Sequence, residues 1–303
     1  MVNERKEIKR KARRLGFFLM SHQLFFQIGS AILLVILTAA LSLAGMTYLE
    51  DAMLCIASDV MQLVAGVFFL VFYLVNRKKI RQIPMNKKKC SGSLFGKSIL
   101  AIFAVNMILS LIEMVLVMFT GFSLSVPMDE MTNMNPVLMF VLVAVFPAIV
   151  EELLYRGVLY RYLRGHGVQF AAIVSSAIFG LIHMNFLQFF FASFMGVVCC
   201  YIYEATGKLR YSMLLHLLNN SVLVLFSFLP LSDMANVVIQ IVLGILSLIV
   251  AVVFLARRKV RWGGLMTDIG KETKRNCLYF FTSIPMLVFA LACLAVCVYM
   301  SFS

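Results

Sequence analysis

Apolar runs of about twenty residues recur along the chain and are separated by short polar segments. A run of this length lets an α-helix cross the hydrocarbon core of a bilayer. The strands of a membrane β-barrel would instead alternate in polarity over about ten residues each, whereas these runs are continuous. The pattern predicts an all-α polytopic membrane protein with about nine transmembrane helices. The expected spans are 17–46, 52–76, 98–121, 136–160, 168–184, 187–205, 211–230, 235–256 and 278–301.

The composition agrees with this pattern and excludes an ordinary soluble globule. Of the 303 residues, 62% are hydrophobic and 14% are charged, whereas soluble proteins carry about 25% charged residues. Seven cysteines lie mostly inside apolar runs with no CxxC spacing, so we interpret them as small packing residues. We expect the chain to divide into an N-terminal part with a basic tail and three helices (1–130), a central core (131–230) and C-terminal helices (231–303).

The net charge of +13 is explained by membrane topology, without a nucleic-acid partner. In the nine-span arrangement, all 27 Lys and Arg residues fall in segments on one side of the membrane, and the opposite loops contain only acidic charges. Cytoplasmic loops of membrane proteins are enriched in Lys and Arg. We therefore expect a multi-pass cell-membrane protein with a cytoplasmic N-terminus and an external C-terminus. The basic segments are 5–14, 77–97, 156–164, 208–210 and 257–275.

A few charged residues lie inside the expected spans, where burial in lipid makes them costly and indicates function. Adjacent carboxylates Glu151 and Glu152 point about 100° apart on a helix, so they cannot share one role. Glu152 and Arg156 are spaced i,i+4 and are predicted to pair. Glu151 then lacks a local cation and is a candidate general base. The intramembrane charged residues are Asp59, Glu113, Glu151, Glu152, Arg156 and Glu204.

Two further apolar helices each carry a histidine. His183 follows Phe179 by four residues, so that the aromatic ring is expected to pack beside the imidazole, and His216 precedes Asn220 by four. Glu151 and His183 both lie roughly 20 Å along their helices from the turn near Gly165. These residues are therefore expected to face one cavity, with His216 and Asn220 beside them.

This set of side chains suits peptide hydrolysis without a Ser or Cys nucleophile. A carboxylate and a neutral imidazole can activate water, while a second histidine and an amide stabilise an oxyanion. A competing use of Glu and two His is a zinc site. However, HExxH is absent, as are GxSG and GxGD, which disfavours zinc, serine and aspartyl intramembrane proteases. No cofactor or metal is expected.

The three elements resemble the EExxxR, FxxxH and HxxxN motifs of the CAAX protease and bacteriocin-processing family, also called Abi or Rce1-like intramembrane glutamic proteases. They occur in the family's order over roughly residues 135–225. The motif residues are Glu151, Glu152, Arg156, Phe179, His183, His216 and Asn220.

The resemblance implies a fold with an eight-helix-like protease core and assigns roles to these residues. Glu151 and His183 would activate the water, and His216 with Asn220 would form the oxyanion site. Arg156 would hold Glu152 and contact a substrate carboxylate. The implied substrate is a membrane-associated or lipidated peptide, with the bilayer as surroundings; the sequence specifies no oligomeric state.

Two functions of other classes remain open from the sequence. Some members of this family act by binding, as bacteriocin immunity proteins or membrane scaffolds, and such a protein would tolerate replacement of Glu151. A transporter would instead use Asp59, Glu113 and Glu151 as relay groups, although no inverted pair of broken helices supports it.

Overall fold

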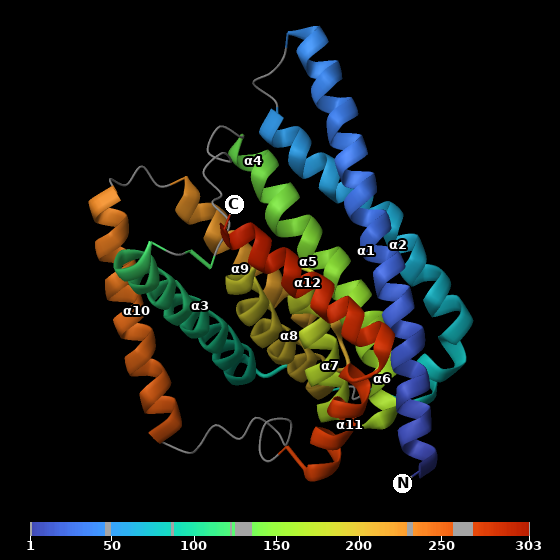
Figure 1. The fold of residues 1–303 in the computed structure, drawn as a ribbon. Coiled ribbons are helices and arrows are strands. Elements are labelled where there is room, and N and C mark those ends of the chain that lie inside the picture. The colour runs from blue at the N-terminus through green and yellow to red at the C-terminus, as the bar shows by residue number, and fades with distance from the viewer. Residues whose placement is uncertain are drawn as a thin grey trace.

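The computed structural model describes residues 2–45, 50–85, 88–121, 123–124, 135–228, 233–256 and 269–302. These residues form helices and contain no strand, which confirms an all-α fold (Figure 1). The elements are α1 (Val2–Ala44), α2 (Glu50–Gln82), α3 (Gly92–Thr120), α4 (Pro136–Met139), η3 (Phe140–Val145), α5 (Phe146–Glu151), η4 (Glu152–Tyr160), α6 (Arg161–Leu163), η5 (Arg164–His166), α7 (Val168–Leu181), α8 (Phe186–Thr206), α9 (Leu209–Ser227), α10 (Asp233–Ala256), α11 (Lys271–Phe281) and α12 (Ile284–Phe302).

Six helical segments in the described part of the chain are long and apolar enough to cross a membrane. This confirms a polytopic membrane protein, whereas the count of nine spans stays a prediction. The expected ninth span, 278–301, is wrong as a single continuous helix. The polypeptide forms two helices there, because α11 ends at Phe281 and α12 begins at Ile284. Pro285 lies in the first turn of α12, where its missing N–H costs nothing.

Side-chain caps and glycines set the ends of two of the long helices. Ser91 Oγ accepts from Leu94 N at 3.1 Å at the start of α3, and Asn185 Oδ1 accepts from Gln188 N at 2.9 Å at the start of α8. Gly121 and Gly207 end these helices with φ of 69° and 66°, a conformation that favours glycine. Local sequence therefore determines where α3 and α8 begin and end.

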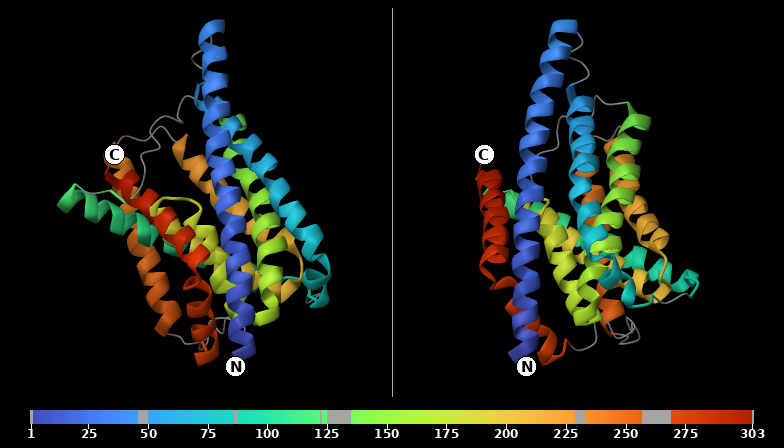
Figure 2. Two further views of the ribbon diagram at one scale, coloured as in Figure 1. Left: turned by 45° about the vertical axis from the view of Figure 1, so that its right-hand side comes forward. Right: turned by 90° about the vertical axis from the view of Figure 1, so that its right-hand side faces the viewer.

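The helical hairpin of α7 and α8 lies at the centre of the molecule. The pair α1 and α2 packs on one flank, while α3 and α10 lie together on the other (Figures 1 and 2). Without a hydrophobic driving force in lipid, membrane helices associate best through small residues. The buried faces of α7 and α8 supply them: Ala171, Ala172, Ser175, Ser176, Gly180, Ala192, Gly196, Cys199 and Cys200.

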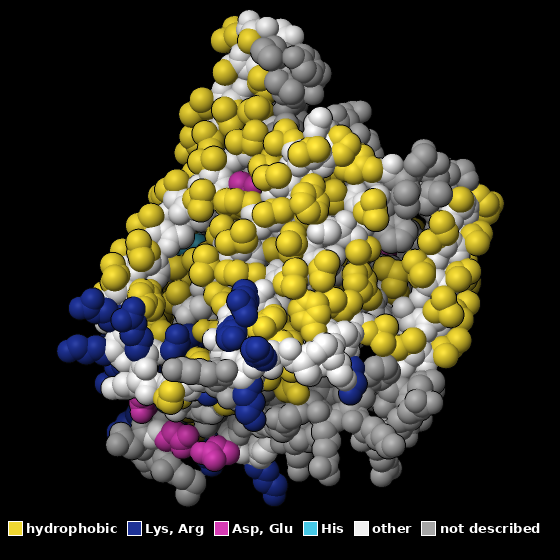
Figure 3. Space-filling model, turned by 180° about the vertical axis from the view of Figure 1, so that it is seen from behind, with side chains coloured by type: hydrophobic (Ala, Val, Ile, Leu, Met, Phe, Trp, Pro, Cys, Tyr) yellow, Lys and Arg dark blue, Asp and Glu magenta, His cyan; other side chains and the backbone are white. Residues whose placement is uncertain are grey.

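Lys and Arg side chains gather toward the end of the molecule that carries the N-terminus, below a broad hydrophobic surface (Figure 3). Exposed apolar side chains are numerous on the long helices, as in Val75 of α2, which is 78% exposed, and Phe119 of α3, which is 77% exposed. This separation of charge from apolar surface is the distribution that a lipid bilayer requires. The cytoplasmic orientation of the basic end stays a prediction.

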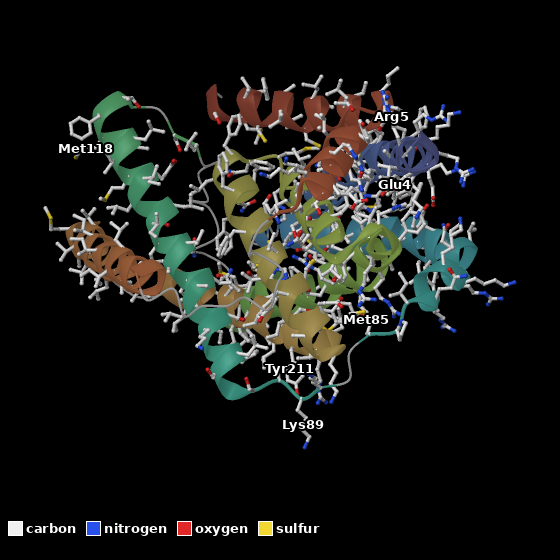
Figure 4. All side chains as sticks on the ribbon, turned by 90° about the horizontal axis from the view of Figure 1, so that it is seen from below. Glu4, Arg5, Met85, Lys89, Met118 and Tyr211 are labelled. Carbon is white, nitrogen blue, oxygen red and sulfur yellow. The ribbon has the colours of Figure 1, made fainter. Side chains whose placement is uncertain are left out.

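Labelling of Cys90 tests that orientation. Cys90 lies between α2 and α3, beside exposed Lys89 at the basic end (Figure 4). A membrane-impermeant maleimide is expected to modify Cys90 in inverted vesicles and not in intact cells, as measured by mass spectrometry of the tagged peptide. Cys90→Ser is the control for background. Equal modification in intact cells would place the basic end outside and contradict the predicted topology.

Candidate active site

A buried ion pair lies at the centre of the candidate site. Arg156 Nη1 lies 2.8 Å from Glu152 Oε1, and the two side chains are 1% and 0% exposed. Both belong to the π-helical segment η4. The i,i+4 spacing predicted this pair, and the structure contains it. Arg156 is 1% exposed, and its expected contact with a substrate carboxylate stays a prediction.

The guanidinium of Arg156 also packs on an aromatic ring. Its Cζ lies 4.3 Å from the centroid of the Phe179 ring, within the range of a cation–π interaction. Space for the guanidinium comes from Gly196 of α8, where a Cβ would lie 3.0 Å from Arg156 Nη2. Arg156 is thus enclosed by η4, α7 and α8 together.

His216 on α9 connects the two glutamates. Its Nδ1 lies 3.3 Å from Glu152 Oε1, and its Nε2 lies 3.8 Å from Glu151 Oε2. The imidazole also meets the edge of the Phe179 ring, with centroids 6.1 Å apart. His216 is 3% exposed. The helix α9, which is distant in sequence, therefore covers the two carboxylates.

Glu151 receives support from α2, which sequence reasoning did not include in the site. Gln62 Nε2 donates to Glu151 Oε1 at 3.2 Å. Asp59, three residues earlier on α2, is a second carboxylate near Glu151, and its negative charge opposes that of Glu151. The sequence signal was available, because Asp59 and Gln62 are spaced i,i+3 in an apolar helix. Gln62 is neutral, so the cost of placing a charge in lipid does not single it out.

His183 lies in a turn, and the expectation that it extends the helix of Phe179 is wrong. The helix α7 ends at Leu181, and the His183 N–H bonds to Gly180 O at 3.2 Å. The ring still packs on Phe179, with centroids 4.9 Å apart, and Nδ1 lies 2.7 Å from Phe179 O. A carbonyl oxygen only accepts, so Nδ1 carries the proton. In the neutral ring, Nε2 therefore keeps a free lone pair.

Asn220 holds α9 against an irregular stretch of helix. Its Nδ2 donates to Val143 O at 3.2 Å, and its Oδ1 accepts from Asn219 Nδ2 at 3.1 Å. Val143 O lacks its usual donor four residues on, because Pro147 has no N–H. Asn220 thus binds a carbonyl to which Pro147 cannot donate.

The motif residues are therefore brought together, but unequally. Direct polar contacts link Glu151, Glu152, Arg156 and His216. The ring of His183 packs on Phe179 and reaches this group only through that ring. Asn220 contacts the backbone of η3. Among the residues that the structure describes, no group of three or more His, Cys, Asp or Glu is arranged to hold a metal ion. The absence of a metal requirement stays a prediction.

The fold and the site together define a helical membrane protein with a buried glutamate–histidine centre. Residues 133–222 match the family model described as type II CAAX prenyl endopeptidase Rce1-like. This segment includes every motif residue, so the resemblance found in the sequence is confirmed, and the chain carries an Rce1-like domain. The family indicates a peptidase that acts in a membrane. No curated protein and no solved structure matched the chain.

Replacement of Gly196 by Ala should disturb the enclosed Arg156. The added Cβ would lie 2.8 Å from Ser176 Cβ and 3.0 Å from Arg156 Nη2, so we expect a loss of about 1–3 kcal/mol of stability. Thermal unfolding of the purified protein in detergent measures this loss. Gly66→Ala is the matched control, because nothing lies within 4 Å of its Cβ. Identical unfolding temperatures for the two variants would refute the close packing at Gly196.

Proposed function

We propose that this protein is an intramembrane endopeptidase that hydrolyses a peptide bond in a membrane-associated or lipidated peptide. One observation carries the proposal: Glu151 lies between Gln62 and His216 in a site closed by a buried ion pair. The match to an endopeptidase family over the same residues supports it. The location of the site among apolar helices supports a substrate held at the membrane.

Water activation is assigned to Glu151 and His183. The carboxylate and the free Nε2 lone pair of His183 both accept protons, and Glu151 interacts electrostatically with His183. One of these groups takes a proton from water as the water oxygen attacks the carbonyl carbon. The proton is then delivered to the amide nitrogen as the C–N bond breaks. Neither step forms a covalent bond to the protein.

His216 and Asn220 are assigned to the developing oxyanion. The amide of Asn220 has two N–H donors, and its bond to Val143 O occupies one, which leaves the other for the substrate oxygen. Because Glu152 can only accept, His216 Nδ1 donates to it, so in this scheme the ring donates to the oxyanion from Nε2 as an imidazolium, on the side that faces Glu151. Donors held in place before the reaction stabilise the transition state without reorganisation.

A transporter that uses Glu113 as a relay group has less support than a peptidase. Its carboxylate accepts from Ser123 Oγ at 2.7 Å and from Leu124 N at 2.9 Å. These contacts fasten the segment after α3, which gives Glu113 a structural use. A protein that acts by binding remains the alternative, and it is an outcome of the experiment below.

Glu151→Gln is expected to abolish cleavage. The purified protein in liposomes would be incubated with a library of membrane-associated and prenylated peptides, and products would be identified by mass spectrometry. Gln keeps the size and the polar contacts of Glu but cannot act as a base, so the rate should fall by about 100-fold or more. Glu113→Gln makes the same chemical change outside the site and should retain activity.

A chelator added to the wild-type reaction tests the metal-free scheme, and activity is expected to persist. Equal cleavage by wild type and Glu151→Gln would contradict Glu151 as the base. Absence of cleavage in both, together with a cellular function that survives Glu151→Gln, would favour the binding-only alternative.

Gln62→Ala tests the contribution of α2. Loss of a hydrogen bond to a charged group costs about 1.5–3 kcal/mol, so the cleavage rate should fall by about 10- to 100-fold. Gln82→Ala, at the exposed end of the same helix, is the control and should cleave normally. An unchanged rate in Gln62→Ala would show that this contact does not position Glu151 for the reaction.

A further inference from the structure

A stripe of cations runs along one face of α1 before its apolar part begins. The four residues are spaced i,i+3,i+4,i+7, which places them on one side of the helix. A different face of the same turns carries fully buried Ile8, Ala12 and Leu15, so the cations face away from the helical core. The basic stripe consists of Lys6, Lys9, Arg10 and Arg13.

This basic stripe lines a cavity of about 890 Å³ between α1 and the break between α11 and α12. Thr282, Ser283 and Ile284 form the other wall. One carboxylate, Glu7, also lines it, but Glu7 lies 3.6 Å from Lys11 Nζ and 3.8 Å from His166 Nε2. In the described part of the chain, no carboxylate lies within 4.0 Å of any cation of the basic stripe. The cavity therefore carries uncompensated positive charge.

Contacts on both sides of the cavity hold its walls in place. On one side, Glu4 accepts from buried Asn276 at 3.1 Å, and Arg5 lies 5.0 Å from the centroid of the Tyr279 ring (Figure 4). On the other side, Gly16 lets α1 approach the backbone of α12, because a Cβ there would lie 2.6 Å from Met286 N. The cavity is thus a feature of the packed helices.

The surroundings of the cavity point to an amphipathic ligand. Phe17, one turn after Arg13, is 62% exposed, and Ile284 is 77% exposed. Apolar surface therefore continues directly from the charged cavity onto the part of α1 that spans the membrane. A ligand that suits both parts has an anionic head and an acyl chain.

We propose that this cavity binds the phosphate headgroup of an anionic phospholipid from the surrounding leaflet. Lys and Arg attract anionic headgroups at the membrane surface, and four of them converge here on one cavity. The bound lipid would fasten α1 to α11 and α12 at the basic end of the molecule. This inference is independent of the proposed peptidase activity.

The experiment measures lipid retained by the full-length protein in native mass spectrometry. Detergent-solubilised protein is titrated with phosphatidylglycerol or phosphatidylcholine of identical chains, and wild type should retain the anionic lipid about tenfold better. Replacement of Lys6, Lys9, Arg10 and Arg13 by Gln should remove this preference. The matched control replaces Arg77, Lys78, Lys79 and Arg81 of α2 by Gln, which removes the same charge from exposed positions and should keep it.

Ile284→Glu provides a second variant that should fold. A carboxylate is favourable in the first turn of a helix, yet here it would repel a phosphate at the cavity wall. Equal loss of lipid in the basic-stripe and control variants, or no preference in wild type, would overturn the proposal. Binding of soluble glycerol 3-phosphate as tightly as the lipid would also overturn it, since the site would then serve a free phosphate.

Discussion

The buried pair of Glu152 and Arg156 is the interaction on which the rest of the site depends. Isolated charges are very costly inside a membrane protein, and removal of one partner of a buried pair costs about 3–5 kcal/mol. Other elements enclose the pair: Phe179 covers the guanidinium, Gly196 leaves room for it, and His216 contacts the carboxylate. The packing of η4, α7, α8 and α9 is therefore coupled to the chemistry that they hold.

Irregular helix geometry places the two glutamates differently. Glu151 ends α5 and Glu152 begins the π-helical segment η4, and the neighbouring carboxylates share His216 but otherwise meet different partners. Upstream, Asn220 binds the Val143 carbonyl, to which Pro147 cannot donate. One carboxylate is consequently neutralised by Arg156, while the other meets Gln62 and His216, which suits one structural role and one reactive role.

The site extends beyond the segment that matches the Rce1-like family. Gln62 comes from α2, outside residues 133–222, and donates a hydrogen bond to the glutamate proposed as the base. The same N-terminal region supplies the basic stripe of α1. The expected N-terminal part, 1–130, thus contributes to the site and to the membrane-facing cavity, through helices that the family match does not include.

The sequence by itself determined the helical class, the helix pairs at i,i+4 and the segregation of charge, because these follow from local periodicity and from the cost of charge in lipid. It also identified the motif residues. Only the tertiary structure decided that His183 lies in a turn, that Arg156 is enclosed and that Gln62 reaches Glu151. Those outcomes depend on contacts between helices far apart in the chain, such as the 89 residues between Gln62 and Glu151, which no local pattern encodes.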